Sequence, residues 1–123
     1  CAAVYICDCQ TGALGLVHSG RKGTQQAVVV RAIEKMCAAY ESDPHNLEVA
    51  ISPCIRPPRY EVDLPSLLKE QLLGAGIPSG QIASSEECTG AHVDRYYSYR
   101  VEKGNTGRML ALLGRRMNNV LPV

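Results

Sequence analysis

The chain has 123 residues, which is enough for one domain, and its 46% hydrophobic content is ordinary for a globular protein. The 13 Lys and Arg residues nearly balance the 12 Asp and Glu residues, so the net charge of +1 gives no reason to expect a nucleic acid or a membrane surface as partner. No run approaches the roughly 20 apolar residues of a membrane span, and the sequence contains no charged-then-apolar signal segment. We expect a cytoplasmic protein, because the cysteine pattern described below favours reduced thiols.

The first third of the sequence predicts a hairpin followed by a helix. Ala2–Cys7 is an apolar, partly β-branched run that is typical of a buried strand, and Ala13–Val17 is expected to return beside it after a short turn. Apolar residues then recur at helical spacing, which predicts one helix from Thr24, as its N-cap, to about Glu41.

The remainder predicts a Pro-rich surface loop over residues 52–60, a helix over Pro65–Leu73 that starts after Asp63, and four strands. These strands are expected at Leu47–Ile51, Gln81–Ser84, Tyr96–Tyr99 and Met109–Leu113. The element order ββαβαβββ predicts an α+β fold, a layered α/β sandwich with a mixed sheet, in which residues 1–123 form a single domain.

Cys1 and His18 are the strongest candidates for a chemical role. Pairing of the first two strands would set their far ends side by side, and would thereby bring the thiol and the imidazole together. These groups suit zinc or copper, and they also suit a cysteine nucleophile with a histidine base. A buried Cys and a hydrogen-bonded His without any chemical role are the structural alternative.

The stretch His18-Ser-Gly-Arg-Lys-Gly-Thr24 is expected to run from a strand end into a helix start. Free backbone N–H groups, close backbone approach at the glycines and the charges of Arg21 and Lys22 would suit a phosphate or a carboxylate. The alternative is a solvated turn with two surface cations. Cys88 and His92, at a C-x3-H spacing, form a weaker candidate metal pair.

The six cysteines are an even number that could form disulfides, but their positions in a hairpin and within an amphipathic helix favour reduced thiols. Four arginines fall in loops or at strand ends, where any of them could line a polar pocket and where most such residues are simply exposed. They are Arg56, Arg59, Arg95 and Arg100.

Five stretches match a known family in order, and together they cover essentially the whole chain. They are Cys1 with its hairpin to His18, the stretch His18–Thr24, the loop Ser52–Val62, Cys88-Thr89, and Tyr96–Arg100 continuing to Met109. This sequence resembles the YfiH-type laccase-domain family, described as multicopper polyphenol oxidase-like and as purine nucleoside phosphorylases. Two departures are Arg21-Lys22, where the family usually has Trp-Arg, and a shorter segment after Val62.

The resemblance implies a metal site and an activity. In the family one Cys and two His bind a catalytic metal, usually assigned as zinc, which implies Cys1 and His18 as ligands here. The other His belongs to an N-terminal half that this chain lacks, so the chain is expected to be the C-terminal part of a longer protein.

The implied reaction is phosphorolysis of adenosine, inosine or guanosine to the base and ribose 1-phosphate, with adenosine deamination as a further activity. Arg21, Lys22 and Arg56 would then bind the nucleoside and phosphate, and Cys1 would be a thiolate ligand. A Cys–His hydrolase acting on an amide or peptide bond, a copper-dependent polyphenol oxidase and an inactive fragment remain alternatives.

Overall fold

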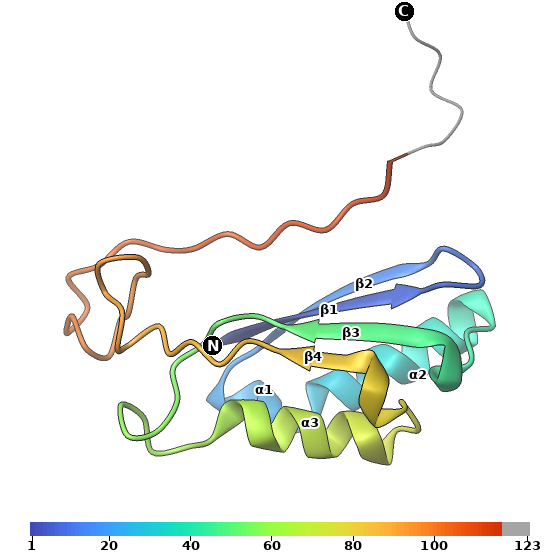
Figure 1. Cartoon of the computed structure of the whole chain (residues 1–123), viewed down its shortest axis with the longest axis horizontal. Helices are drawn as coiled ribbons and strands as arrows, with labels where there is room; N and C mark the ends of the chain where they lie inside the picture. The colour runs from blue at the N-terminus through green and yellow to red at the C-terminus, as the bar shows by residue number, and fades with distance from the viewer. Residues whose placement is uncertain (117–123) are drawn as a thin grey trace, which may run out of the picture.

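A computed structural model describes residues 1–116 of the chain. Within this range a four-stranded sheet in the order β2-β1-β3-β4 carries the helices on one of its faces (Figure 1). The strands are β1 (Ala2–Asp8), β2 (Leu14–Ser19), β3 (Leu47–Ile51) and β4 (Ile82–Ser84). The helices are α1 (Arg21–Gln25), α2 (Val28–Tyr40) and α3 (Leu64–Gly74), with short 3-10 turns η1 (Pro44–Asn46) and η2 (Ser79–Gln81) before β3 and β4.

The sheet is mixed, as predicted. β1 pairs antiparallel with both β2 and β3, whereas β4 runs parallel to β3. The α+β class and the mixed sheet are therefore confirmed. No helix within residues 1–116 combines the length and the apolar character needed to cross a bilayer.

One face of the sheet is buried and the other is not. In β1 the residues Ala2, Val4, Ile6 and Asp8 are buried, and those between them are partly exposed, because successive side chains of a strand point to opposite faces. The buried face packs against the helices through a core of mainly Val, Ile and Leu, in a sequence that contains no Trp and no Phe. The helical members of this core are Val29, Ile33, Met36, Leu64, Leu68 and Leu72.

The prediction of one helix from Thr24 to Glu41 is wrong. The chain forms α1 and α2 and breaks between them at Ala27, whose φ of 53° lies in the left-handed region. Thr24 is not an N-cap, because it lies inside α1 and is buried with its hydroxyl 2.7 Å from that of Ser19. The apolar positions at helical spacing all lie from Val28 onward, so the periodicity predicts α2 correctly, and the error comes from placing the helix start at Thr24.

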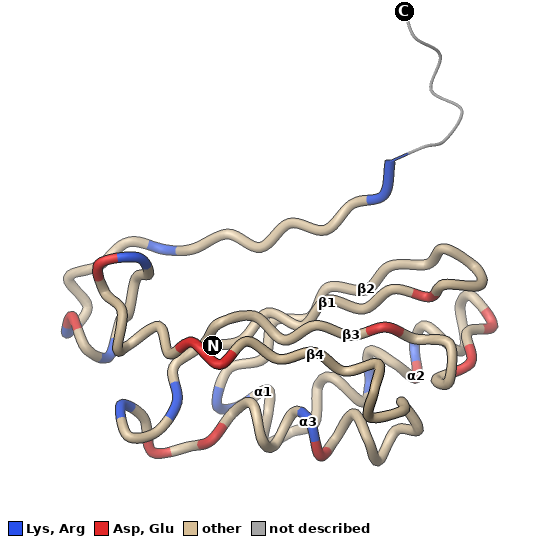
Figure 2. Tube along the Cα trace, viewed as in Figure 1, with Lys and Arg blue, Asp and Glu red and all other residues tan. Residues whose placement is uncertain are grey.

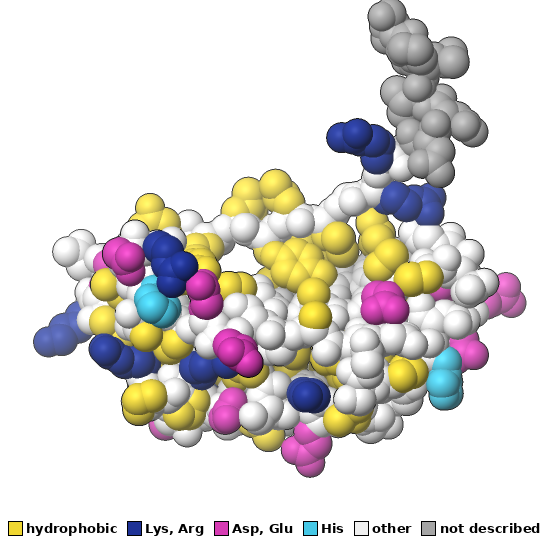
Figure 3. All heavy atoms as spheres, viewed as in Figure 1, with side chains coloured by type: hydrophobic (Ala, Val, Ile, Leu, Met, Phe, Trp, Pro, Cys, Tyr) yellow, Lys and Arg dark blue, Asp and Glu magenta, His cyan; other side chains and the backbone are white. Residues whose placement is uncertain are grey.

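The strands predicted at Tyr96–Tyr99 and Met109–Leu113 are also wrong. Residues 85–104 form turns and loops at one end of the sheet, and the chain beyond them runs extended on the side away from the helices (Figure 1). Within the described range no strand pairs with Met109–Leu113, and Leu110 and Leu112 are 82% and 77% exposed. The observed order is ββααβαβ. Figure 3 shows exposed apolar side chains on the visible face, some of them along this extended segment.

The other predicted elements are confirmed within one or two residues, including the Asp63 cap, which accepts a hydrogen bond from the Ser66 amide at 3.2 Å. The Pro-rich loop is only partly a surface loop. Its residues Cys54 and Ile55 are buried, and Cys54 forms an isolated parallel bridge with Cys88. All six cysteines are free thiols.

Candidate functional site

The hairpin of β1 and β2 carries both residues of the predicted metal pair at one end. Its register pairs Ala2 with Ser19 and Ala3 with His18. Ala2 and Ser19 point into the core, so His18 and Cys1 lie on the opposite face, which the helices leave open. Both side chains are exposed, and the register makes them diagonal neighbours on that face.

Gly20 fixes where the thiol lies. A Cβ atom built on Gly20 would be 2.9 Å from the Cys1 Sγ atom and 3.9 Å from its Cβ atom. The sulfur therefore occupies the space that any larger residue at position 20 would fill. This close approach places the thiol beside Gly20, the residue that precedes α1.

Thiolate and imidazole both bind zinc, so Cys1 and His18 suit a zinc site. The described residues, however, provide fewer metal ligands than a complete zinc site needs. Within residues 1–116 no three or more His, Cys, Asp and Glu side chains are grouped so that they could hold a metal ion. Zinc in proteins takes at least three protein ligands. Cys1 and His18 could thus be part of a zinc site only with a further ligand.

Cys88 and His92 do not belong to such a group either. Cys88 is buried, and its thiol donates a hydrogen bond of 3.6 Å to the backbone oxygen of Arg56. This contact joins the Pro-rich loop to the segment after β4. The thiol of Cys88 is therefore engaged in a hydrogen bond between two segments of the chain.

Arg56, which the sequence predicted to bind the substrate, forms a hydrogen bond within the protein. Its guanidinium donates a hydrogen bond to the backbone oxygen of Ser85, and its Nε is buried without a partner in the described structure. Burial raises the pKa of the neighbouring Cys54 thiol, an effect that the positive charge of Arg56 opposes. Substrate binding by Arg56 stays a prediction.

Arg21 and Lys22 are the first two residues of α1, and both are exposed. The helix therefore starts at Arg21, whereas the sequence predicted a start after Gly23. The guanidinium of Arg21 is not a free cation, because its Nη1 donates a hydrogen bond of 2.9 Å to Oε1 of Glu61.

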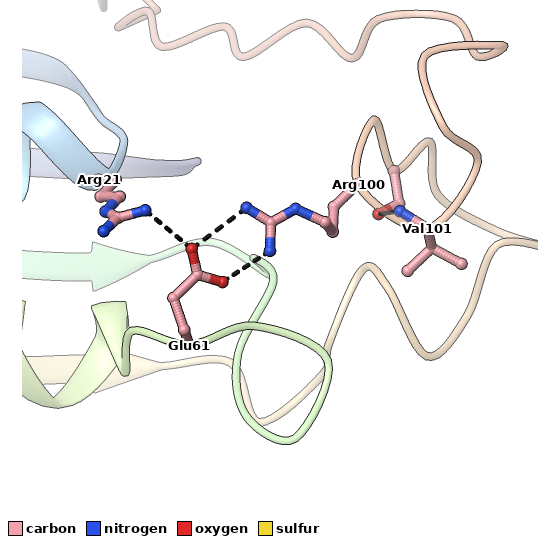
Figure 4. A network of polar contacts seen from close by, with 5 residues as sticks. Arg21, Glu61, Arg100 and Val101 are labelled. Atoms are coloured by element: carbon pink, nitrogen blue, oxygen red, sulfur yellow. Dashed lines mark hydrogen bonds and ion pairs between the residues drawn. The ribbon is translucent and has the colours of Figure 1, made fainter.

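Glu61 is a residue that the sequence analysis did not single out. Its carboxylate also accepts two hydrogen bonds from Arg100, from Nη1 to Oε2 at 2.6 Å and from Nη2 to Oε1 at 3.2 Å (Figure 4). The Arg100 guanidinium lies over the ring of Tyr60, 4.8 Å from the ring centroid. One carboxylate thus joins α1, the loop before α3 and the loops after β4.

The hydrogen bonds from Arg100 are the main reason that the pKa of Glu61 is lowered to about 2, and the charges of Arg100 and Arg21 add to the effect. The carboxylate is therefore ionised throughout the neutral range. Figure 2 shows charges of both signs interspersed along the trace, and Glu61 with its two arginines is a local cluster within this mixture.

The signal for this cluster was present in the sequence, since both Tyr60-Glu-Val62 and Tyr96–Arg100 lie in stretches that carry the family resemblance. The pairing itself was not visible, because Glu61 and Arg100 are 39 positions apart and neither lies in a regular element. Spacing rules apply to neighbours on one helix or strand, not to contacts between loops.

Comparison with known proteins gives a consistent result. A sequence model of a family described as multi-copper polyphenol oxidoreductase laccase matches residues 1–65 and 59–116. A relative from Geobacillus stearothermophilus, named purine nucleoside phosphorylase YlmD, is 32% identical over 94% of this chain and 53% of its own length. A purine nucleoside phosphorylase from Staphylococcus epidermidis is 31% identical over the same shares.

Solved structures show the same similarity. The crystal structure of YlmD from Geobacillus stearothermophilus superposes with a TM-score of 0.87 at 28% identity, over 95% of this chain and 54% of that one. The hypothetical protein YfiH of Bacillus licheniformis gives a TM-score of 0.77 at 25% identity, over 87% and 51%. The chain therefore spans about half the length of the relatives that it matches.

Proposed function

The chain belongs to the multi-copper polyphenol oxidoreductase laccase family, and we propose that it forms half of a zinc-dependent purine nucleoside phosphorylase. The observation that carries this proposal is the 32% identity, over 94% of this chain, to a relative named purine nucleoside phosphorylase. Because the match spans only 53% of that relative, the activity is proposed for a complete protein in which a His from another segment completes the site.

Cys1 and His18 are the residues that we propose as zinc ligands. Both residues suit this role, because they are exposed on the open face of one hairpin and because thiolate and imidazole are preferred zinc ligands. A bound zinc ion would supply a Lewis acid close to the substrate. Cys1 would act as a thiolate ligand and not as an attacking group.

Phosphorolysis forms a bond between a phosphate oxygen and C1′ of the ribose, while the bond from C1′ to the purine nitrogen breaks. The purine leaves with that electron pair and takes up a proton. Phosphate enters as an anion, so Arg21 and Lys22, exposed at the start of α1, are proposed to bind and orient it. Arg56 is proposed to contact the nucleoside.

The test is turnover by the complete protein. Inosine and phosphate should give hypoxanthine and ribose 1-phosphate, and Cys1→Ser should abolish this reaction. Cys9→Ser is the matched control, because Cys9 is an exposed thiol in the hairpin turn and lies at the far end of β1. Retained turnover in Cys1→Ser would remove the proposed role of the thiol, and no phosphorolysis by the wild-type protein would remove the function. Ammonia release from adenosine tests deamination in the same preparation.

A second candidate is a Cys–His hydrolase acting on an amide bond. It is favoured by the exposed thiol and imidazole on one face, together with the shortage of metal donors within residues 1–116. A metal assay separates the two candidates. Stoichiometric zinc supports the phosphorylase, whereas a metal-free protein whose amidase activity is lost on alkylation of Cys1 supports the hydrolase.

A further inference from the structure

Glu61 forms ion pairs with two arginines that are far apart in the sequence. Arg21 comes from the first position of α1 and Arg100 from the loops after β4, and both donate to the same carboxylate at 2.6–3.2 Å. The two guanidinium groups are thus held on either side of one anchoring group, as Figure 4 shows.

The pair keeps most of its binding capacity. A guanidinium has five N–H donors. Toward Glu61, Arg21 uses one N–H group and Arg100 uses two. Two positive charges against one negative charge leave a net charge of +1, and the Arg21 and Arg100 side chains are 53% and 52% exposed. Oriented guanidinium groups with free donors match the geometry of a phosphate group.

The pair also lies near the predicted chemical end of the hairpin. Arg21 directly follows Gly20, the residue against which the sulfur of Cys1 packs. An anion held by Arg21 would therefore be close to the face that carries Cys1 and His18. Tyr60, which lies under the Arg100 guanidinium, restricts the second arginine in its orientation.

From this arrangement we infer that Glu61 is a positioning residue, which holds Arg21 and Arg100 together as the binding site for the inorganic phosphate of the reaction. The inference rests on the proposed function, because phosphate is a substrate only in phosphorolysis. Arg100 thereby joins Arg21 as a phosphate ligand, and Glu61 acts through both arginines without contacting the substrate.

A purely structural role makes a different prediction. If the cluster only fastens loops, its loss should leave the Michaelis constants unchanged, and it should lower the folded fraction only slightly, because exposed ion pairs add little to stability. If Glu61 is a positioning residue, its substitution should raise the KM for phosphate and not that for the nucleoside, because the misplaced arginines would bind the anion more weakly.

The experiment uses the complete protein and the variant Glu61→Gln, with Glu87→Gln as matched control. Glu87 also forms an exposed ion pair, at 3.0 Å to Arg95 in the loops after β4, but it lies outside the cluster. Glu61→Gln is expected to raise the KM for phosphate on the order of tenfold, with an unchanged KM for inosine, because small displacements of positioning groups are costly. Glu87→Gln should change neither constant.

Phosphate binding measured by calorimetry, on protein treated with a chelator and without nucleoside, separates the inference from the function. Weaker phosphate binding in Glu61→Gln than in wild type supports the inference even if the wild-type protein catalyses no phosphorolysis. Equal phosphate binding, or turnover with an unchanged KM for phosphate, overturns the inference and leaves the function intact. Circular dichroism checks folding, and Glu61→Asp serves as the second variant if Glu61→Gln does not fold.

Discussion

Gly20→Ala is a substitution that displaces the Cys1 thiol while leaving the fold unchanged. Gly20 has φ −90° and ψ −161°, an extended conformation that alanine adopts without strain. The added Cβ would lie 2.9 Å from the Cys1 Sγ atom. Non-bonded heavy atoms prefer about 3.5–4.0 Å, so the sulfur has to move by roughly 0.6–1.1 Å.

The fold should absorb this shift, because Cys1 is exposed and precedes β1. We expect the free energy of unfolding to change by less than about 0.5 kcal/mol, as for most surface substitutions. Metal affinity is more sensitive, since changes in the residues that orient a ligand typically lower it by about 10–100-fold. If Cys1 is a zinc ligand, Gly20→Ala should lower the zinc affinity of the complete protein by about this factor.

Competition with a chromogenic chelator measures the zinc affinity, and urea unfolding measures the stability. Gly80→Ala is the matched control, because a Cβ atom on Gly80 meets nothing within 4 Å. Unchanged zinc affinity in Gly20→Ala would refute the assignment of this thiol as a ligand. A loss of stability of similar size to the loss of affinity would instead show that the contact supports the fold.

Two further predictions follow from the backbone and the charges. Ala27→Gly should stabilise the protein by about 1 kcal/mol, because a left-handed conformation costs L-residues about 1–2 kcal/mol and costs glycine nothing. Ala32→Gly, inside α2, should destabilise it by about the same amount in thermal melts, and a loss in both variants contradicts the strain at Ala27. The second prediction concerns pH. Because the pKa of Glu61 in the folded chain is lowered to about 2 from an ordinary 4.5, its contribution to stability is present above about pH 4.5 and is lost as the pH falls toward 2. The difference in stability between wild type and Glu61→Gln should therefore vanish over this interval, and a constant difference would contradict the ion-pair network.

The elements that the sequence predicted correctly are those whose signal is local. β1 and β3 have short apolar patterns, and α3 starts at an Asp cap with a following proline, so a few neighbouring residues suffice to define each of them. The relation of Cys1 to His18 was accessible for the same reason. A hairpin with a short turn fixes its own register, and the register decides which residues share a face.

The errors arise where a distant contact or a single backbone angle decides the structure. Ala27 separates the polar stretch of α1 from the apolar repeat of α2, and nothing in an alanine predicts a left-handed conformation. Met109–Leu113 has the composition of a strand but lacks a partner strand in the described range, and a strand exists only where its backbone groups are paired. Glu61 depends on Arg100, which sequence spacing could not connect to it.

On the side of the sheet away from the helices, an incomplete set of metal ligands and exposed apolar side chains occur together. Cys1 and His18 lie on that face and lack a third metal donor within the described range. The extended segment after Gly104 runs on the same side (Figure 1), and its Leu110 and Leu112 are exposed. Exposed apolar side chains of this kind mark surfaces that pack against another part of a protein. The His that the proposed zinc site requires should therefore approach from this side, because the opposite face is already filled by α2 and α3.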